Sequence, residues 1–106
     1  MIDFTDVLPT LADLANTKPP AGITIDGHSF AATLRGQKGE EREWVHTQLG
    51  NRKWVRDKRW KLMGTGELYD LANDPWEEHP IRSGVGDEPA TAARARLAAV
   101  MATLKV

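Results

Sequence analysis

The sequence predicts a small α+β fold, in which a four-stranded antiparallel sheet packs against a carboxyl-terminal amphipathic helix and follows an amino-terminal helix. Apolar residues recur at helical spacing near both ends of the chain. Between these segments lie four short runs typical of strands, separated by turn signals. With 106 residues, 41% of them hydrophobic, the chain has room for one small core. A sheet with helical elements against it would bury the apolar faces.

The first helix is predicted from a stripe of apolar residues at helical spacing, namely Phe4, Val7, Leu8, Leu11, Leu14 and Ala15. Pro9 lacks an N–H and fits best in a first turn, so the helix should start near Thr5 or Asp6. The segment 16–20, which contains two prolines, should end it.

An extended loop and a short helical segment should follow. Asp26-Gly27 is a turn signal, and Ser29 is placed to cap a short helix that runs through Leu34. Gly36 suits the left-handed end of that helix. The polar and charged segment 37–43 is expected to face solvent.

Four strands are predicted over residues 44–49, 54–56, 60–63 and 67–71. Their connections are of hairpin length, which favours an antiparallel meander over a parallel sheet. Alternation places Trp44, His46 and Gln48 on one side of the first strand.

A final helix is predicted to begin near Asp87 or Glu88, with Pro89 in its first turn, and to run to residue 105. Its apolar stripe consists of Ala93, Leu97, Val100, Met101 and Leu104, while Arg94, Arg96 and Lys105 lie elsewhere on it. The whole chain, 1–106, is interpreted as one domain built from the segments 1–36, 44–71 and 88–105.

Composition excludes several classes of function. The net charge of -1 argues against a whole-chain affinity for nucleic acid or an anionic membrane. No apolar run approaches the roughly 18 residues of a membrane span. The absence of cysteine excludes disulfides, zinc-thiolate sites and a cysteine nucleophile. The first six residues do not have the pattern of a signal peptide, and the compartment stays unassigned.

Five short motifs occur in a fixed order between Asp6 and Glu78. They are Asp6-x-x-Pro9-Thr10-Leu11, Asp26-Gly27-x-Ser29-Phe30, Leu34-x-Gly36, Val55-Arg56 followed by Lys61-Leu62, and Glu67-Leu-Tyr-Asp-Leu71 with Asp74-Pro75-x-Glu77. In this order they resemble the carboxyl-terminal end of a sulfatase of the arylsulfatase class, a formylglycine-dependent group within the alkaline-phosphatase superfamily. His79-Pro80-Ile81 departs from the family pattern, which often has Asn-Leu there.

The resemblance implies a parent enzyme that hydrolyses sulfate esters with a formylglycine, made from the Cys or Ser of a Cys/Ser-x-Pro-x-Arg motif, and with calcium held by Asp and Asn ligands. Neither that motif nor an Asp-Asp pair occurs here. The chain itself is therefore expected to hold no cofactor and no catalytic residue. Its expected partner is the large amino-terminal α/β domain of the parent, and an apolar patch left bare would allow self-association. Relatives in this family are often exported.

Three residues are candidates for the rim of a substrate cleft: His46, Arg52 and Arg56. Asp26 and His28 are of metal-ligating types, but a metal site needs three or four converging ligands, so a turn beside a surface imidazole is the simpler interpretation.

An alternative function rests on a basic hairpin between Arg52 and Lys61. Its cations, Arg52, Lys53, Arg56, Lys58, Arg59 and Lys61, are interleaved with Trp54 and Trp60. Such a surface is typical of a free-standing module that binds a sulfated glycan or nucleic acid. The competing interpretation is a solvated hairpin whose basic stems cover inward-pointing indole rings.

Overall fold

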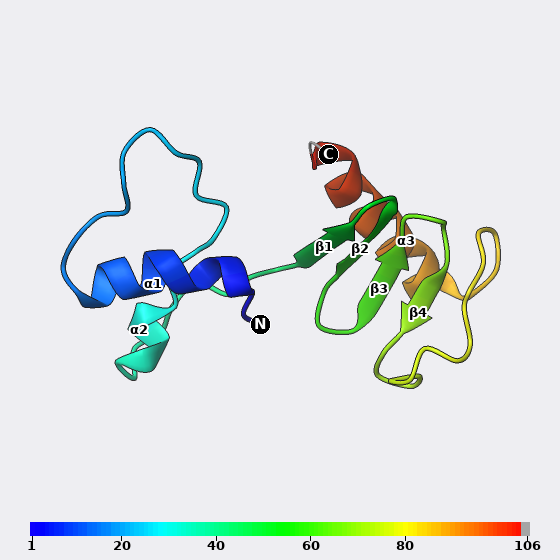
Figure 1. Ribbon diagram of the computed structural model, residues 1–106. Coiled ribbons are helices and arrows are strands. Elements are labelled where there is room, and N and C mark those ends of the chain that lie inside the picture. The colour runs from blue at the N-terminus through cyan, green and yellow to red at the C-terminus, as the bar shows by residue number, and fades with distance from the viewer. Residues whose placement is uncertain (105–106) are drawn as a thin grey trace. The chain divides into compact units, whose positions relative to one another are not determined.

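The computed structural model describes residues 1–104, which divide into two compact units, the first Met1–Glu43 and the second from Trp44 onward. We call them unit 1 and unit 2 and describe each by itself. Unit 1 is helical, and unit 2 contains a four-stranded antiparallel sheet with the carboxyl-terminal helix (Figure 1). The predicted α+β class is therefore confirmed.

Unit 1 begins with the short 3-10 helix η1 (Phe4–Asp6), which continues into α1 (Val7–Leu14). The Asp3 side chain accepts a hydrogen bond from the Phe4 N–H and so caps the first turn. Asn16 adopts a left-handed φ of 53° and ends the helix, inside the segment predicted to stop it.

The second helix of unit 1 is α2 (Ala31–Leu34), which packs against α1. Its N-cap is Phe30, which makes no side-chain cap, so the prediction that Ser29 occupies the cap is off by one residue. The Ser29 hydroxyl still accepts a hydrogen bond from the Ala31 N–H at 3.2 Å. Gly36 ends the segment with a φ of 76°, as predicted.

Unit 2 contains β1 (Val45–Leu49), β2 (Arg52–Arg56), β3 (Trp60–Met63) and β4 (Leu68–Asp70), in the spatial order β1-β2-β3-β4. All neighbouring pairs are antiparallel, with Val55 opposite both His46 and Leu62. Beyond β4, Ile81 forms an isolated antiparallel bridge to Leu68. The predicted meander is therefore confirmed.

Helix α3 (Glu88–Thr103) covers one face of this sheet and contacts β2, β3 and β4 (Figure 1). Asp87 caps it by accepting a hydrogen bond from the Ala90 N–H, and Pro89 lies in the first turn as predicted. The buried core that results consists of Val55, Trp60, Leu62, Leu68, Ala90, Ala93 and Leu97. The prediction for Lys105 lies outside the described residues. Within the described part, no helix has the length and apolar character needed to cross a membrane.

Candidate functional site

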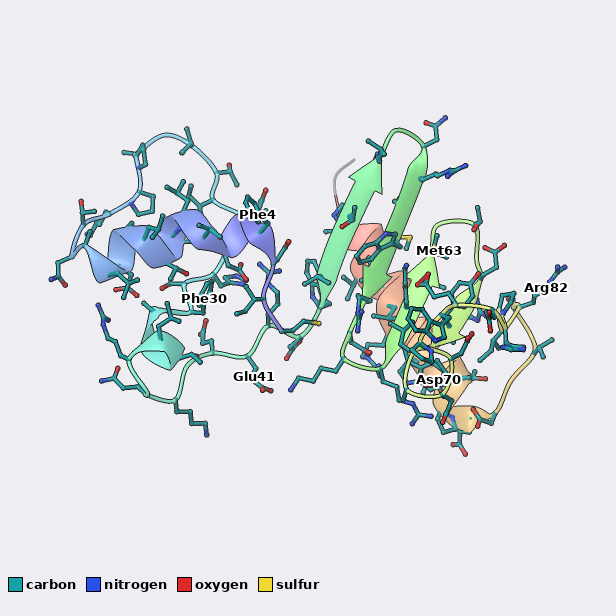
Figure 2. The ribbon with its side chains drawn as sticks, turned by 60° about the horizontal axis from the view of Figure 1, so that its bottom comes forward. Phe4, Phe30, Glu41, Met63, Asp70 and Arg82 are labelled. Carbon is teal, nitrogen blue, oxygen red and sulfur yellow. The ribbon has the colours of Figure 1, made fainter. Side chains whose placement is uncertain are left out.

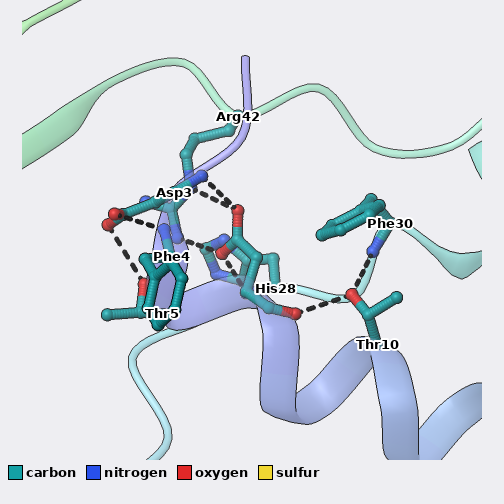
Figure 3. Close-up of polar contacts among 8 residues, drawn as sticks. Asp3, Phe4, Thr5, Thr10, His28, Phe30 and Arg42 are labelled. Atoms are coloured by element: carbon teal, nitrogen blue, oxygen red, sulfur yellow. Dashed lines mark hydrogen bonds and ion pairs between the residues drawn. The ribbon is translucent and has the colours of Figure 1, made fainter.

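In unit 1, the first two family-like motifs meet around the buried carboxylate of Asp6, which is only 3% exposed. Its oxygens accept hydrogen bonds from the backbone N–H groups of Asp3 at 2.9 Å and His28 at 2.8 Å. They also accept two from the Arg42 guanidinium, at 3.1 Å from Nε and 2.6 Å from an Nη atom (Figure 3). The carboxylate therefore joins the helix start to two distant segments of the unit.

Thr10 extends this network by one helical turn. Its buried hydroxyl donates a hydrogen bond to the Asp6 carbonyl at 2.6 Å and accepts one from the Phe30 N–H at 3.0 Å (Figure 3). On the surface nearby, the Ser29 hydroxyl donates to Asp13 at 2.9 Å. The polar residues of both motifs are thus used to attach one segment to the other.

Gly27 is required where these segments touch. A Cβ built on it would lie 1.8 Å from the Thr5 carbonyl oxygen and 2.4 Å from its carbon. Contacts this short with backbone atoms cannot be relieved without moving the chain. The glycine of Asp-Gly-x-Ser-Phe is therefore explained by close approach of two backbones.

Arg42 is a residue of this network that the sequence did not reveal. The segment 37–43 was expected to face solvent, and that expectation is wrong for Arg42, whose side chain is 8% exposed. The residue lies 36 positions from Asp6, so no local spacing links the two. An arginine in a charged segment carries no signal of burial until its carboxylate partner is known.

Competing effects set the acidity of Asp6. Burial by itself raises the pKa of this carboxyl, whereas the hydrogen bonds from Arg42, Asp3 and His28 lower it, and the net result is a pKa of about 2. The Asp6 hydrogen bond in turn raises the pKa of Arg42, against the opposing effect of burial. The pair is charged at neutral pH.

The large apolar residues of unit 1 lie outside this polar interior. Phe4 is 89% exposed (Figure 2) and Leu11 58%, while only Ala12 and Ala31 are buried apolar residues in the unit. We define the apolar face of unit 1 as Phe4, Leu8, Leu11 and Leu14, which recur at helical spacing along η1 and α1. The predicted apolar stripe exists, but unit 1 itself leaves it uncovered.

In unit 2, the acidic motif residues shape turns. Asp70 accepts two hydrogen bonds from Arg59, at 2.9 and 2.8 Å, and one from the Asn73 amide at 2.8 Å. Mainly because of Arg59, the pKa of Asp70 falls to about 2. The Asp74 carboxylate accepts hydrogen bonds from the backbone N–H groups of Glu78 and His79, each at 2.9 Å. Both carboxylates thus organise the chain that follows β4.

Two cations of the basic hairpin, Arg59 and Lys61, are paired with carboxylates that lie outside it. Lys61 lies 4.8 Å from the centre of the Trp54 ring and forms an ion pair with Glu77. Arg59 lies 4.6 Å from the Trp60 ring centre and pairs with Asp70. Stems over indole rings, with carboxylates on the cations, favour the solvated-hairpin interpretation over a polymer-binding surface.

The three rim candidates do not come together. His46 lies opposite Val55, and therefore on the helix-facing side of the sheet, whereas Arg52 and Arg56 alternate onto the open side. Arg56 donates to the Asp57 carbonyl at 3.1 Å. The Nε2 atom of His46 is buried and has no hydrogen-bond partner among the described residues. Their role at a substrate cleft stays a prediction.

The described residues do not fit the cofactors of a formylglycine sulfatase. Asp26 and His28 are exposed and belong to no group of three ligands. Asp74, Glu78 and His79 do bring ligand atoms within 4.8 Å of one another, but both Asp74 oxygens already accept backbone N–H groups, and the other two side chains are exposed. With neither a cysteine nor a Ser-x-Pro-x-Arg sequence, the chain also lacks a precursor for formylglycine.

Comparison with known proteins finds two related sulfatases. An ulvan-active sulfatase of Formosa agariphila is 29% identical over 126 aligned residues, covering 78% of this chain and 25% of that protein. A Delta 4,5-hexuronate-2-O-sulfatase of Bacteroides thetaiotaomicron is 40% identical over 89 residues, covering 68% of this chain and 18% of that protein. The resemblance to sulfatases is confirmed.

The aligned share of each protein shows which part of a sulfatase this chain resembles. Most of this chain aligns with a quarter or less of each relative, which fits a carboxyl-terminal portion of a sulfatase. No protein-family model matches the chain. The likeness to a part of sulfatases therefore rests on the ordered motifs together with these two relatives.

Proposed function

We propose that this chain is the non-catalytic carboxyl-terminal part of a sulfuric ester hydrolase and that it stabilises the remainder of that enzyme. The two relatives support the enzyme class. The lack of a formylglycine precursor supports the non-catalytic role. Calcium and formylglycine would then be held by residues outside this chain.

One observation carries the proposed packing role: unit 1 buries polar groups and exposes apolar ones. Asp6 and Thr10 are each no more than 3% exposed, while the apolar face of unit 1 lies open. Hydrophobic burial is the main favourable term in folding and association, so an uncovered helical stripe indicates a missing neighbour. The chain spans at most a quarter of its relatives, and we assign that neighbour to the rest of the sulfatase.

The names of the two relatives are the basis for proposing a substrate class. Their names refer to ulvan and to a 2-O-sulfated hexuronate. We therefore propose a sulfated carbohydrate as the substrate of the complete enzyme. This chain would contribute at most part of the cleft rim, with Arg52 and Arg56 on the open side of the sheet as its candidates.

Two experiments test the non-catalytic role. An assay of the 106-residue chain with an aryl sulfate and calcium should show no turnover, and calcium-dependent turnover would overturn the proposal. The reading frame upstream of Met1 should encode a Cys/Ser-x-Pro-x-Arg motif, and a frame without it would remove the proposed parent enzyme.

The packing role is tested by association. Sedimentation of the chain should reveal concentration-dependent self-association, because exposed apolar surface favours association. Leu11→Gln should reduce that association, whereas Leu49→Gln, the same change at an 82% exposed position of β1, should not. A chain that stays monomeric, or an equal response to both changes, would argue against docking through this face.

A further inference from the structure

A cavity of about 420 Å³ opens on the helix-facing side of the sheet in unit 2. Its walls come from β2, β3, the turn after β3, the loop after β4 and α3, and they include Lys53, Gly64, Gly66, Arg94, Ala98 and Met101. This size lies within the range of pockets that hold small molecules. Neither the sulfatase relationship nor the motifs assign it a role.

Small residues on both walls create the space. Gly64 and Gly66 contribute no side chain, and Ala98 on α3 contributes only a methyl group. A Cβ on Gly64 would lie 2.8 Å from Cγ of Lys53, so the lysine stem lies directly against this glycine. The hollow is therefore built into the packing of α3 on the hairpin.

Arg94 braces the walls of this cavity. Its guanidinium donates to the carbonyl of Gly66 and, at 2.6 Å, to the carbonyl of Ile81. These bonds tie two loops to α3 and hold the opening in shape. An arginine has five N–H donors, so others remain after two carbonyls are satisfied.

The charge of the lining is of one sign. Lys53 and Arg94 are its ionisable residues, and none of the described lining residues is acidic. Within residues 1–104, Lys53 has no carboxylate partner, in contrast to Arg59 and Lys61 on the same hairpin. The uncompensated cations lie beside an apolar floor to which Met101 contributes, and methionine adapts readily to a ligand's shape.

We propose that this cavity binds a small anion with an apolar body, namely an aromatic or alkyl carboxylate or sulfate. Lys53 and the free N–H groups of Arg94 would hold the anionic group, and the floor would contact the apolar part. The inference goes beyond the proposed sulfatase role and does not depend on it, because it concerns equilibrium binding in unit 2 alone.

The test is a ¹H–¹⁵N NMR titration of the 106-residue chain with 4-nitrobenzoate and, separately, with 4-nitrophenyl sulfate. Saturable shifts are expected at the amides of Gly64, Gly66 and Ala98 with at least one anion, and the arm that binds more tightly identifies the preferred head group. Neutral 4-nitrobenzyl alcohol should bind about tenfold more weakly, since loss of one charged contact of about 1.4 kcal/mol gives that factor.

Two variants and a matched control sharpen the result. Lys53→Gln should weaken binding about tenfold, and Ala98→Leu should abolish it by filling the hollow while leaving α3 intact. Lys18→Gln makes the same change at an exposed lysine of unit 1, outside the lining of the cavity, and should leave the affinity unchanged. Equal binding of the neutral probe, shifts confined to other residues, or an unaltered affinity in Lys53→Gln would each overturn the proposal.

Discussion

The buried carboxylate of Asp6 gives the sharpest prediction about unit 1. Its pKa falls from the ordinary 3.8 to about 2, a difference worth roughly 2–3 kcal/mol in favour of the charged, folded form. Asp6→Asn keeps the shape of the side chain but removes the charge that the buried Arg42 guanidinium pairs with, and breaking such buried pairs costs roughly 3–5 kcal/mol. We expect a loss of about 2–4 kcal/mol.

Hydrogen exchange at the His28 amide is the direct assay, because that N–H donates to Asp6. A unit of this size has little stability to lose, so protection should disappear in Asp6→Asn. Asp26→Asn, an exposed aspartate in the same unit, is the matched control and should leave protection unchanged. If the two variants behave alike, the network does not hold unit 1 together.

The same group fixes a pH dependence of definite sign. The folded-state pKa of Asp6 lies below its unfolded value, so the stabilisation is fully present above about pH 4 and is lost as the pH falls towards 2. Exchange protection at the His28 amide should follow this course. Protection that rises on acidification through this window would contradict the assigned charge state.

Three further predictions concern packing and charge. Gly27→Ala should destabilise unit 1 by on the order of 2 kcal/mol, because the new methyl group meets the Thr5 carbonyl, and loss of amide dispersion in NMR spectra would show it. Leu97→Ala should lower the stability of unit 2 by about 2–5 kcal/mol in urea, whereas Leu49→Ala at an exposed site should change it by less than about 0.5. Asp70 should titrate at about pH 2 by carbon NMR, and an ordinary value near 3.8 would exclude its bond to Arg59.

Local signals predicted most of unit 2. Alternation and turn residues located all four strands to within two residues, with β3 at Trp60–Met63 as expected. The capping aspartate and following proline placed the start of α3. These signals work because each depends on residues close together in the chain.

The candidate site was less accessible to such reasoning. The motifs indicated a sulfatase, but the residues of the first two motifs form hydrogen bonds with each other. Asp6 and Thr10 accept hydrogen bonds from the backbone of His28 and Phe30. No contact among the rim candidates was predicted. In the sheet, His46 lies opposite Val55, the neighbour of Arg56, so the side chains of His46 and Arg56 point to opposite faces. The cavity beside Lys53 had no sequence signature, because small residues form a hollow only when two elements face each other.

The sequence by itself determined the order of elements, the resemblance to sulfatases and the absence of a formylglycine precursor, since composition, periodicity and short motifs are properties of the chain alone. Only the tertiary structure decided that Arg42 is buried against Asp6 and that the stripe on α1 remains bare. Burial depends on what lies across from a residue, and a partner 36 positions away leaves no trace in local spacing.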